Sequence, residues 1–366
     1  MQFKKLHYID WARQNIDGNF KYNLGNSCMT YLTKEDLGLG LNDIELYGGK
    51  SGISEVLKSK IAKMYGVDEQ NILITTGATM SLFLLCSVLL ESRDDVILEA
   101  PNYEPLYKTV LHFTSTVKII ERRFDKGFQL DLEELERKIS RNAKAIIITN
   151  VHNPSGVSTS PEKLSTIGQI ARDYKTMVIS DEVYLDGVLN PQLKPAVTLG
   201  QNMISINSMT KIFGLPQIKI GWIAADEGII KRLNAAYLYI TGGSVSYPSQ
   251  MIALKALQNA DSILSRYKDV VSRNIKVISD WINSRDDVEW DEPEGGTTCF
   301  IRIPSGVDDV RIADLLMQKY NTLIVPGNFF WARGFIRISF GCNTETLQVG
   351  LSNIGKALDE VKKKSF

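Results

Sequence analysis

Two lysines lie eight positions apart in the largely apolar stretch SMTKIFGLPQIKIGW, which runs from Ser208 to Trp222. Lysine seldom leaves water, so a lysine at the end of a buried strand is unusual. Burial disfavours the charged amine and lowers its pKa, and a neutral amine can attack a carbonyl carbon. For Lys211 the residues alone leave two readings open, a reactive amine and a side chain that extends to the surface.

Polar residues also follow two other apolar runs. Asp181 and Tyr184 end the run in SDEVY, where an unpaired buried carboxylate would be costly. A cationic ring nitrogen could pair with this carboxylate, and so could a structural hydrogen-bond donor from a neighbouring loop. In TTGAT, Ala78 and Thr79 follow Gly77 at the start of an expected helix. Free N–H groups there could bind phosphate, although a tight turn explains the glycine equally well.

The segment NVHNPSG places Asn153 before a proline, and the Asn-Pro pair is common in loops and turns. A single histidine such as His152 in this segment is more often a loop residue than a catalytic one. The combination of all these groups is more informative than any one of them. A phosphate anchor, a carboxylate for a pyridinium nitrogen, a phenol and an amide for a ring hydroxyl, and an amine for an aldehyde are together complementary to pyridoxal 5′-phosphate (PLP).

The elements that must position these groups are predicted from hydrophobic patterning. Between residues 50 and 225, β-branched runs alternate with helical patterns, and the alternation predicts an α/β fold, a three-layer sandwich with a mostly parallel seven-stranded sheet covered by helices on both faces. In such sheets ligands bind at the carboxyl ends of the strands, where the polar residues stand. The expected strands are residues 71–76, 95–100, 116–121, 143–149, 176–181, 203–208 and 219–225.

The rest of the chain predicts a smaller α+β domain. A long amphipathic stretch covers residues 252–284, and the first forty residues, which have no periodicity of their own, are expected to run along this domain. We expect a large domain of residues 44–255 and a small domain of residues 1–43 and 256–366. Further strands are expected at 297–303, 322–327 and 335–341, and helices at 309–319 and 344–364.

Seven motifs follow one another along the chain: YGGKSG, TTGAT, APNY, NVHNPSG, SDEVY, SMTKIFGLPQIKIGW and FIRISF. In their order and approximate spacing they resemble the motifs of the fold-type-I PLP enzymes, specifically the aspartate-aminotransferase-like class I/II aminotransferases, from about Tyr47 to Gly341. The resemblance implies an enzyme that moves the α-amino group of an L-amino acid to a 2-oxo acid by a PLP/PMP ping-pong mechanism. It also implies a homodimer with composite active sites.

The resemblance further implies roles for individual residues. Lys211 would be the Schiff-base lysine and would later move a proton between the substrate Cα and the cofactor C4′. Asp181 would keep the pyridine nitrogen protonated, while Asn153 and Tyr184 would hydrogen-bond the ring 3-oxygen. Tyr103 would stack on the ring face. The cofactor phosphate would be bound by Ala78, Thr79, Ser208 and the partner subunit's Tyr47. The substrate would be contacted by Gly25, Asn153 and Arg337.

Arg337, in FIRISF, would clamp the substrate α-carboxylate with its planar fork, and Arg302 and Arg333 are nearby alternatives. Lys219 stands where most relatives carry an arginine that binds the cofactor phosphate. Lysine keeps the charge but offers a point contact. Losing one charge-assisted hydrogen bond costs about 1.5–3 kcal/mol, so we expect PLP still to bind, through the helix terminus, Ser208, Lys219 and the partner tyrosine.

A second departure from the family is LGNSCMTYLT, residues 24–33, where Gly25 fits the family glycine but the flanking residues do not. Substrate identity is therefore open. The shared motifs also fit a C–S lyase, a decarboxylase, a racemase or a cyclase acting on an amino acid. A sensor that binds PLP without catalysis is a third reading, which the lack of any preceding winged-helix segment disfavours.

The composition narrows the function further. The 42 lysines and arginines balance the 42 aspartates and glutamates, which gives no electrostatic footprint for nucleic acid or an anionic membrane. The N-terminus has no apolar signal segment, so a cytoplasmic protein is expected. Cys28, Cys86, Cys299 and Cys342 form no CxxC pair, which disfavours a metal site or a disulfide framework and favours buried free thiols.

Overall fold

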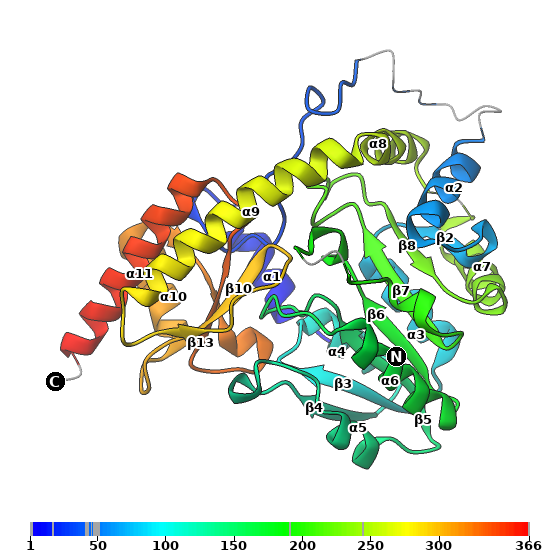
Figure 1. Cartoon of the computed structure of the whole chain (residues 1–366), viewed down its shortest axis with the longest axis horizontal. Helices are drawn as coiled ribbons and strands as arrows, with labels where there is room; N and C mark the ends of the chain where they lie inside the picture. Colours follow the sequence, from blue (N-terminus) through cyan, green and yellow to red (C-terminus); the bar gives the residue numbers. More distant parts are fainter. Residues whose placement is uncertain are drawn as a thin grey trace.

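The computed structural model of the chain describes residues 3–16, 18–40, 44, 46, 52–189, 192–243 and 245–364. All seven strands expected in the first part of the chain form one sheet, in the order β2-β8-β7-β6-β5-β3-β4 (Figure 1). β8 runs antiparallel to both of its neighbours, and the other pairs are parallel. The strands are β2 (Ile72–Thr75), β3 (Asp95–Ala100), β4 (Thr116–Glu121), β5 (Ala143–Thr149), β6 (Met177–Asp181), β7 (Met203–Ser208) and β8 (Gly221–Ala224).

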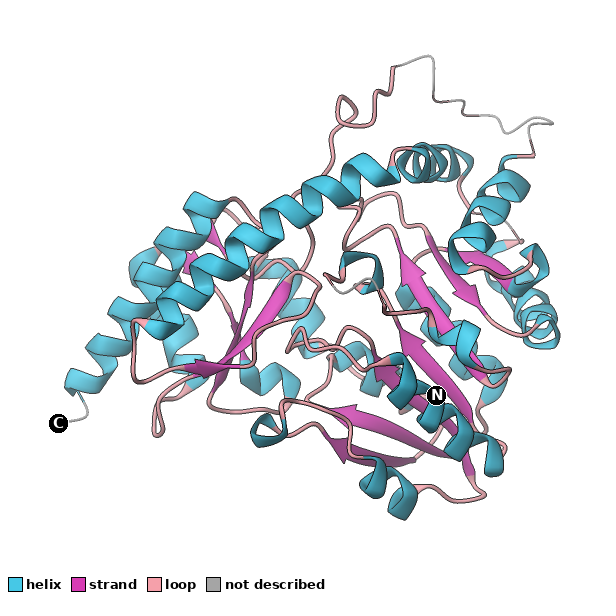
Figure 2. Ribbon diagram, in the orientation of Figure 1, coloured by secondary structure: helices cyan, strands magenta, loops and turns pink. Residues whose placement is uncertain are grey.

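Alternate side chains of these strands pack on opposite faces of the sheet. Leu98 and Ile147 belong to the core on one face, while Ile97 and Ile146 belong to the core on the other. Helices cover both faces, so the predicted three-layer α/β/α sandwich is confirmed (Figure 2). The first face carries α2 (Ile53–Tyr65), α3 (Ala78–Leu89), α4 (Glu104–Val110), α7 (Glu227–Thr241) and α8 (Tyr247–Gln258), and the second carries α5 (Leu132–Lys138) and α6 (Pro161–Asp173).

The second part of the chain forms the expected smaller α+β unit. Its antiparallel sheet has the order β12-β13-β10-β9, and β1 and β11 form a separate parallel pair. The long helix α9 extends from α8, beside the large sheet, across the small sheet (Figure 1). The elements are β1 (Tyr22–Asn23), β9 (Glu289–Trp290), β10 (Thr298–Arg302), β11 (Thr322–Leu323), β12 (Val325–Pro326), β13 (Phe335–Ser339), α9 (Ala260–Asn283), α10 (Asp309–Tyr320) and α11 (Thr344–Lys364).

The amphipathic stretch of residues 252–284 contains the end of α8, at Gln258, and α9, which begins at Ala260. One expectation for this unit needs correction. The run of residues 322–327 is not one strand, because β11 and β12 belong to different sheets. We keep the division into residues 44–255 and residues 1–43 with 256–366 as a proposal. Short 3-10 turns complete the fold: η2 (Glu69–Asn71), η3 (Phe124–Lys126), η4 (Leu185–Gly187), η5 (Ala196–Leu199) and η6 (Gly327–Phe330).

The N-terminal segment contains a helix that the sequence did not predict, α1 (His7–Asn15). Its N-cap residue, Leu6, has no side chain that can cap the first turn. Instead, the Glu104 carboxylate accepts hydrogen bonds from the backbone N–H groups of His7, at 3.0 Å, and Tyr8, at 2.6 Å. A carboxylate at a helix N-terminus is favourable, so a residue nearly a hundred positions away holds the start of α1. The segment then runs along the small unit as expected, since β1 pairs with β11.

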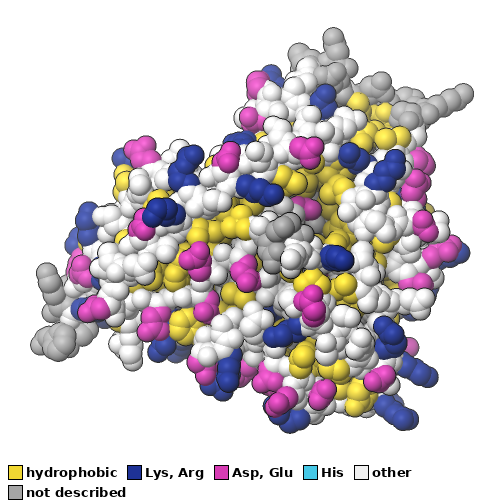
Figure 3. Space-filling model, viewed as in Figure 1, with side chains coloured by type: hydrophobic (Ala, Val, Ile, Leu, Met, Phe, Trp, Pro, Cys, Tyr) yellow, Lys and Arg dark blue, Asp and Glu magenta, His cyan; other side chains and the backbone are white. Residues whose placement is uncertain are grey.

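The surface carries both signs of charge. Lysine and arginine side chains are interspersed with aspartate and glutamate over the face shown in Figure 3, in keeping with the balanced composition. In the part of the chain that the structure describes, no helix combines the length and apolar character needed to cross a bilayer. The same residues contain no cluster of three histidine, cysteine or acidic side chains able to hold a metal ion.

Candidate active site

A pocket of about 480 Å³ opens at the carboxyl ends of the strands of the large sheet. This volume is within the range of small-molecule sites. Residues from five of the seven motifs line it, as the rule for parallel sheets predicts. The sequence-predicted residues in its lining are Ala78, Thr79, Tyr103, Asn153, Asp181, Tyr184, Ser208, Lys211 and Lys219. Tyr47 lies outside the described residues.

One end of the pocket is suited to a phosphate. α3 begins at Ala78, as predicted, and no side chain caps its N-terminus, so its first N–H groups can serve an anion. Gly77 has a φ of 92°, which favours glycine. A Cβ at Gly221 would lie 2.8 Å from the nitrogen of Ala78, so only glycine lets β8 approach this turn so closely. Lys219 reaches the same pocket from a left-handed backbone position, with a φ of 52°, two residues before β8 begins.

Asp181 places a carboxylate in the lining of the pocket. Its Oδ1 accepts a hydrogen bond of 3.3 Å from the backbone N–H of Val183. Burial raises the pKa of Asp181 to about 6, although that hydrogen bond and the nearby amine of Lys211 act to lower it. A buried carboxylate with one weak donor is well placed to pair with a cationic ring nitrogen.

The amine of Lys211 also points into the pocket and donates a hydrogen bond of 2.7 Å to the hydroxyl of Ser27. Burial by itself acts to lower the pKa of Lys211, but the thiol of Cys28 and nearby phenols, including Tyr184, raise it when they ionise, and the net shift is upward. The lowered pKa expected from burial alone is therefore wrong for this arrangement of the chain. Cys28 and the phenols come from other segments of the chain and meet the amine only in the folded structure.

Tyr184 and Thr297 fix the backbone of Ser27. The hydroxyl of Tyr184 donates to the carbonyl oxygen of Ser27 at 3.1 Å, and the hydroxyl of Thr297 donates to the same oxygen at 2.8 Å. A phenol has one O–H group, so Tyr184 can donate to a ring oxygen in the pocket only by releasing Ser27. Thr297 would then still hold the Ser27 carbonyl.

Arg337 lies behind the pocket and contacts it through Asn153. One Nη of Arg337 donates to Oδ1 of Asn153 at 3.3 Å, which leaves the amide N–H₂ of Asn153 available to the pocket. The other Nη donates to Tyr8 Oη at 2.9 Å and to the Gly25 carbonyl oxygen at 3.1 Å. The structure thus brings together the three residues assigned to the substrate side, and it adds Tyr8.

The guanidinium of Arg337 is fully buried, with 0 % of the residue exposed. Across the described ranges no acidic side chain forms an ion pair with it, and its Nε has no hydrogen-bond partner. A buried charge without a counter-ion is expensive. The site is therefore complementary to an anion. The alternatives are less suitable, because Arg302 is exposed and paired with Glu289 at 3.1 Å, and Arg333 is exposed outside the pocket lining.

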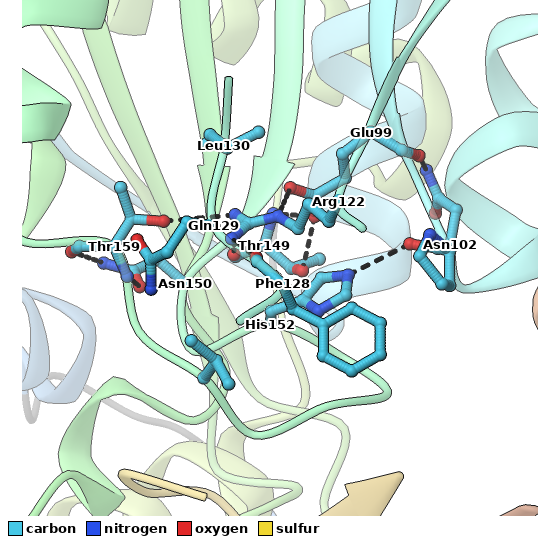
Figure 4. Close-up of polar contacts among 12 residues, drawn as sticks. Glu99, Asn102, Arg122, Phe128, Gln129, Leu130, Thr149, Asn150, His152 and Thr159 are labelled. Carbon is cyan, nitrogen blue, oxygen red and sulfur yellow. Dashed lines mark hydrogen bonds and ion pairs between the residues drawn. The ribbon is translucent and has the colours of Figure 1, made fainter. Parts of the chain in front are cut away.

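A buried polar network around Arg122, Glu99 and Thr149 supports the loop that carries Asn153. Figure 4 shows these three residues. Arg122 and Glu99 form an ion pair of 2.7 Å with side chains 0 % and 1 % exposed. The other oxygen of Glu99 accepts hydrogen bonds of 2.6 Å from both the backbone N–H and the hydroxyl of Thr149. That hydroxyl in turn accepts the backbone N–H of Asn153 at 3.2 Å. The ion pair therefore fixes the loop that presents Asn153.

Substitution of Glu99 by glutamine should destabilise the protein by about 3–5 kcal/mol, because it leaves the Arg122 charge buried without a partner. Chemical denaturation measures the change. Arg123→Met is the matched control. Arg123 is adjacent in sequence and pairs with Asp125 at a similar 2.6 Å, but both side chains are more than half exposed, so no measurable change is expected. An equal loss in the two variants would contradict this account of the network.

A model of the family described as aminotransferase class I and II matches residues 33–354. The chain belongs to this family. The aspartate aminotransferase of Pyrococcus horikoshii is 28% identical over 331 residues, which cover 86% of this chain and 84% of that protein. The capreomycidine synthase of Streptomyces vinaceus is 24% identical over 322 residues, covering 87% and 82%.

Solved structures agree with this assignment. A PLP-dependent aminotransferase from Streptococcus suis matches with a TM-score of 0.91 at 27% identity, over 98% of this chain and 99% of that one. The PLP-dependent cyclase OrfR matches with a TM-score of 0.87 at 20% identity, over 99% and 98%, and shows a common fold alone. The resemblance drawn from the sequence motifs is confirmed.

His152 has a structural position in this aminotransferase. Its Nε2 lies 3.0 Å from the Pro101 carbonyl oxygen, which can only accept, so Nε2 carries the proton and Nδ1 accepts from Ser155 Oγ at 2.7 Å (Figure 4). Burial holds the pKa of His152 well below its usual range. The residue is absent from the pocket lining. It is a neutral loop histidine, the interpretation that the sequence favoured.

Several residues that shape the site were missed from the sequence, namely Tyr8, Ser27, Glu99, Arg122 and Thr297. Glu99 carried a signal, since it is a carboxylate within the strand that ends in EAPNY. Ser27 lies in the segment that departs from the family pattern. Tyr8, Arg122 and Thr297 carried no signal, because their contacts with the site depend on tertiary packing alone.

Proposed function

We propose that this aminotransferase moves the α-amino group of an L-amino acid to a 2-oxo acid by a ping-pong mechanism. One observation carries the proposal. Arg337 is a buried guanidinium with no acidic partner in the described part of the chain, and through Asn153 it borders a pocket that also holds a lysine amine. An α-carboxylate is common to amino acids and 2-oxo acids, so one clamp would serve both substrates.

The cofactor is PLP, as predicted from the sequence and as the family and the Streptococcus suis neighbour indicate. The chain's residues fit it. The uncapped start of α3, Ser208 and Lys219 would bind the phosphate, and Asp181 would face the ring nitrogen. Tyr103 and Asn153 would complete the ring site. When bound, PLP withdraws electrons from the substrate and so stabilises negative charge at its Cα.

The chain's own residues perform the remaining steps. Arg337 would bind the carboxylate and orient the Cα–H bond, and Lys211 would take the proton from Cα and return it on the cofactor side. Asp181, in its ionised form, would hold a proton on the ring nitrogen. Tyr184 and the Asn153 amide would donate to the ring 3-oxygen. Asn153 therefore links the substrate clamp to the cofactor site through its two amide atoms.

We further propose a homodimer with composite sites, in which the partner subunit's Tyr47 reaches the phosphate. In this proposal, Lys219 and that tyrosine together replace the arginine fork that most relatives use. A cytoplasmic location stays a prediction.

Cofactor affinity should fall as the pH drops below about 6, because the carboxyl group of Asp181 has a pKa raised to about 6. Above this pH it is ionised and pairs with a protonated ring nitrogen, and below it the neutral acid cannot. The apparent dissociation constant of PLP, measured by fluorescence between pH 5 and 8, should rise up to about tenfold per pH unit below 6. Asp181→Asn should bind PLP weakly at every pH, and its dissociation constant should not show the additional rise below pH 6. An unchanged pH dependence in that variant would contradict the role of Asp181.

Steady-state kinetics test the function itself. Varying one amino acid at several fixed concentrations of a 2-oxo acid should give parallel double-reciprocal lines, as a ping-pong mechanism requires. The same assay covers the rival outcomes, since some matched proteins are named as a synthase and a cyclase. Consumption of an amino acid without any requirement for a 2-oxo acid, with release of ammonia, carbon dioxide or a cyclised product, would reject the proposal.

A further inference from the structure

The hydroxyl of Ser27 contacts the amine on which the proposed reaction depends. Lys211 Nζ donates to Ser27 Oγ at 2.7 Å, and among the described residues this is the one hydrogen-bond acceptor of the amine. Ser27 is 8% exposed. It lies in residues 24–33, the segment whose departure from the family pattern the proposed function does not explain.

Contacts on both sides hold Ser27 in place. Its carbonyl oxygen accepts from the hydroxyls of Tyr184 and Thr297, at 3.1 Å and 2.8 Å. Two residues on, the backbone N–H of Met29 donates to the carbonyl oxygen of Lys211 itself at 2.9 Å. The backbone segment that carries Ser27 is therefore hydrogen-bonded to the backbone of Lys211. The Ser27 hydroxyl and the Lys211 amine lie next to this backbone contact and form a hydrogen bond of their own. These backbone contacts keep the Cα of Ser27 within reach of the Lys211 amine.

A fixed acceptor next to a lysine amine has a definite chemical effect. A neutral amine has two N–H bonds and one lone pair, and it rotates freely about the Cε–Nζ bond unless a partner holds it. When Ser27 Oγ accepts one N–H, the lone pair can point in fewer directions. We propose that Ser27 is a positioning residue, which holds the free amine of Lys211 so that its lone pair faces the proton on the substrate Cα. This inference rests on the proposed function.

The proton balance of the step involves Lys211 alone. The Cα–H bond breaks as an N–H bond forms on Lys211, and that N–H bond then breaks as the proton passes to the cofactor C4′. Ser27 neither gains nor loses a proton. Tyr184 is not an equivalent partner, since its one O–H group is engaged with Ser27 or with the cofactor.

A kinetic experiment tests the orientation of the amine. Ser27→Ala should lower kcat roughly tenfold, which is the scale of one lost hydrogen bond in the transition state. KM should stay unchanged, because the contact is with Lys211 and not with the substrate. The kinetic isotope effect for an amino acid deuterated at Cα should increase, since the proton transfer becomes slower. Ser27→Thr retains a hydroxyl and should restore kcat.

A second measurement avoids turnover altogether. Protein freed of cofactor is treated with limiting acetic anhydride, and mass spectrometry gives the acetylation of Lys211 relative to Lys219, an internal reference in the same pocket. Loss of the Ser27 acceptor destabilises the ammonium form, so more neutral amine is present and the ratio should rise roughly tenfold in Ser27→Ala. Ser27→Thr should give the wild-type ratio.

The two measurements separate the possible failures. A raised acetylation ratio together with a lower kcat and an unchanged KM in Ser27→Ala supports the inference. An unchanged ratio in an enzyme that transaminates overturns the role of Ser27 and leaves the proposed function intact. If the wild-type protein turns over no amino acid, the proposed function fails, and the positioning role in catalysis fails with it.

Discussion

Replacing Lys211 by alanine is expected to lower turnover of every amino acid by about 10³-fold or more. The residue supplies both the amine that holds the cofactor and the base that moves the Cα proton, and general acid–base catalysis alone contributes roughly 10²- to 10⁴-fold. The amine lines the pocket and donates to Ser27 at 2.7 Å. Initial rates with saturating PLP measure the loss.

The matched control for this experiment is Lys163→Ala. Lys163 is also partly buried and donates to Gln129 and to the Leu130 carbonyl oxygen, at 3.2 Å and 3.3 Å, but it does not line the pocket. Its loss should leave turnover almost unchanged. Borohydride reduction adds a direct readout, since it should fix the cofactor to the peptide that contains Lys211 in the wild-type protein. Fixation to another lysine would contradict the assignment.

Replacing Arg337 by methionine should lower kcat/KM for amino acids by roughly 30- to 5000-fold. Truncating one partner of a buried charge pair costs about 2–5 kcal/mol, and the Arg337 guanidinium is buried with its Nε unpaired. Arg337→Lys keeps the charge but loses the planar fork, so its kcat/KM should lie between the values of the wild-type protein and of Arg337→Met. Thermal denaturation checks that each variant folds.

The substrate itself provides a control for Arg337. An amine without an α-carboxylate cannot use the clamp, so the loss caused by Arg337→Met should disappear with such a substrate. Arg302→Met serves as a second control, because Arg302 is half exposed and paired with Glu289. A larger defect in Arg302→Met than in Arg337→Met would show that the wrong arginine has been assigned.

The inner strands of the large sheet could be predicted because they are buried on both faces. Such strands appear in the sequence as continuous runs rich in valine and isoleucine, and β5 (Ala143–Thr149) is an example. The start of α3 at Ala78 could be predicted for a similar reason, since a glycine turn after a strand is a local signal. α1 could not, because Glu104 stabilises its start across the fold.

The same distinction holds for the site. Asp181, Tyr184 and Lys211 follow apolar runs, and that position is visible in the sequence. The upward shift in the pKa of Lys211 was not predictable, because it depends on Cys28 and on phenols from other segments. The Arg122–Glu99 ion pair was not predictable for the same reason. Its two members become partners only when β3 and the segment after β4 lie side by side.

The most direct test of the central claim is a single-turnover reaction of the PLP-loaded protein with one L-amino acid at a time and no 2-oxo acid. The account predicts that the absorbance of the bound cofactor changes to that of its amine form, with one equivalent of 2-oxo acid released per site. The amino acid that reacts fastest would identify the donor. Release of ammonia, carbon dioxide or a cyclised product, with the cofactor returning to its original absorbance, would contradict the account.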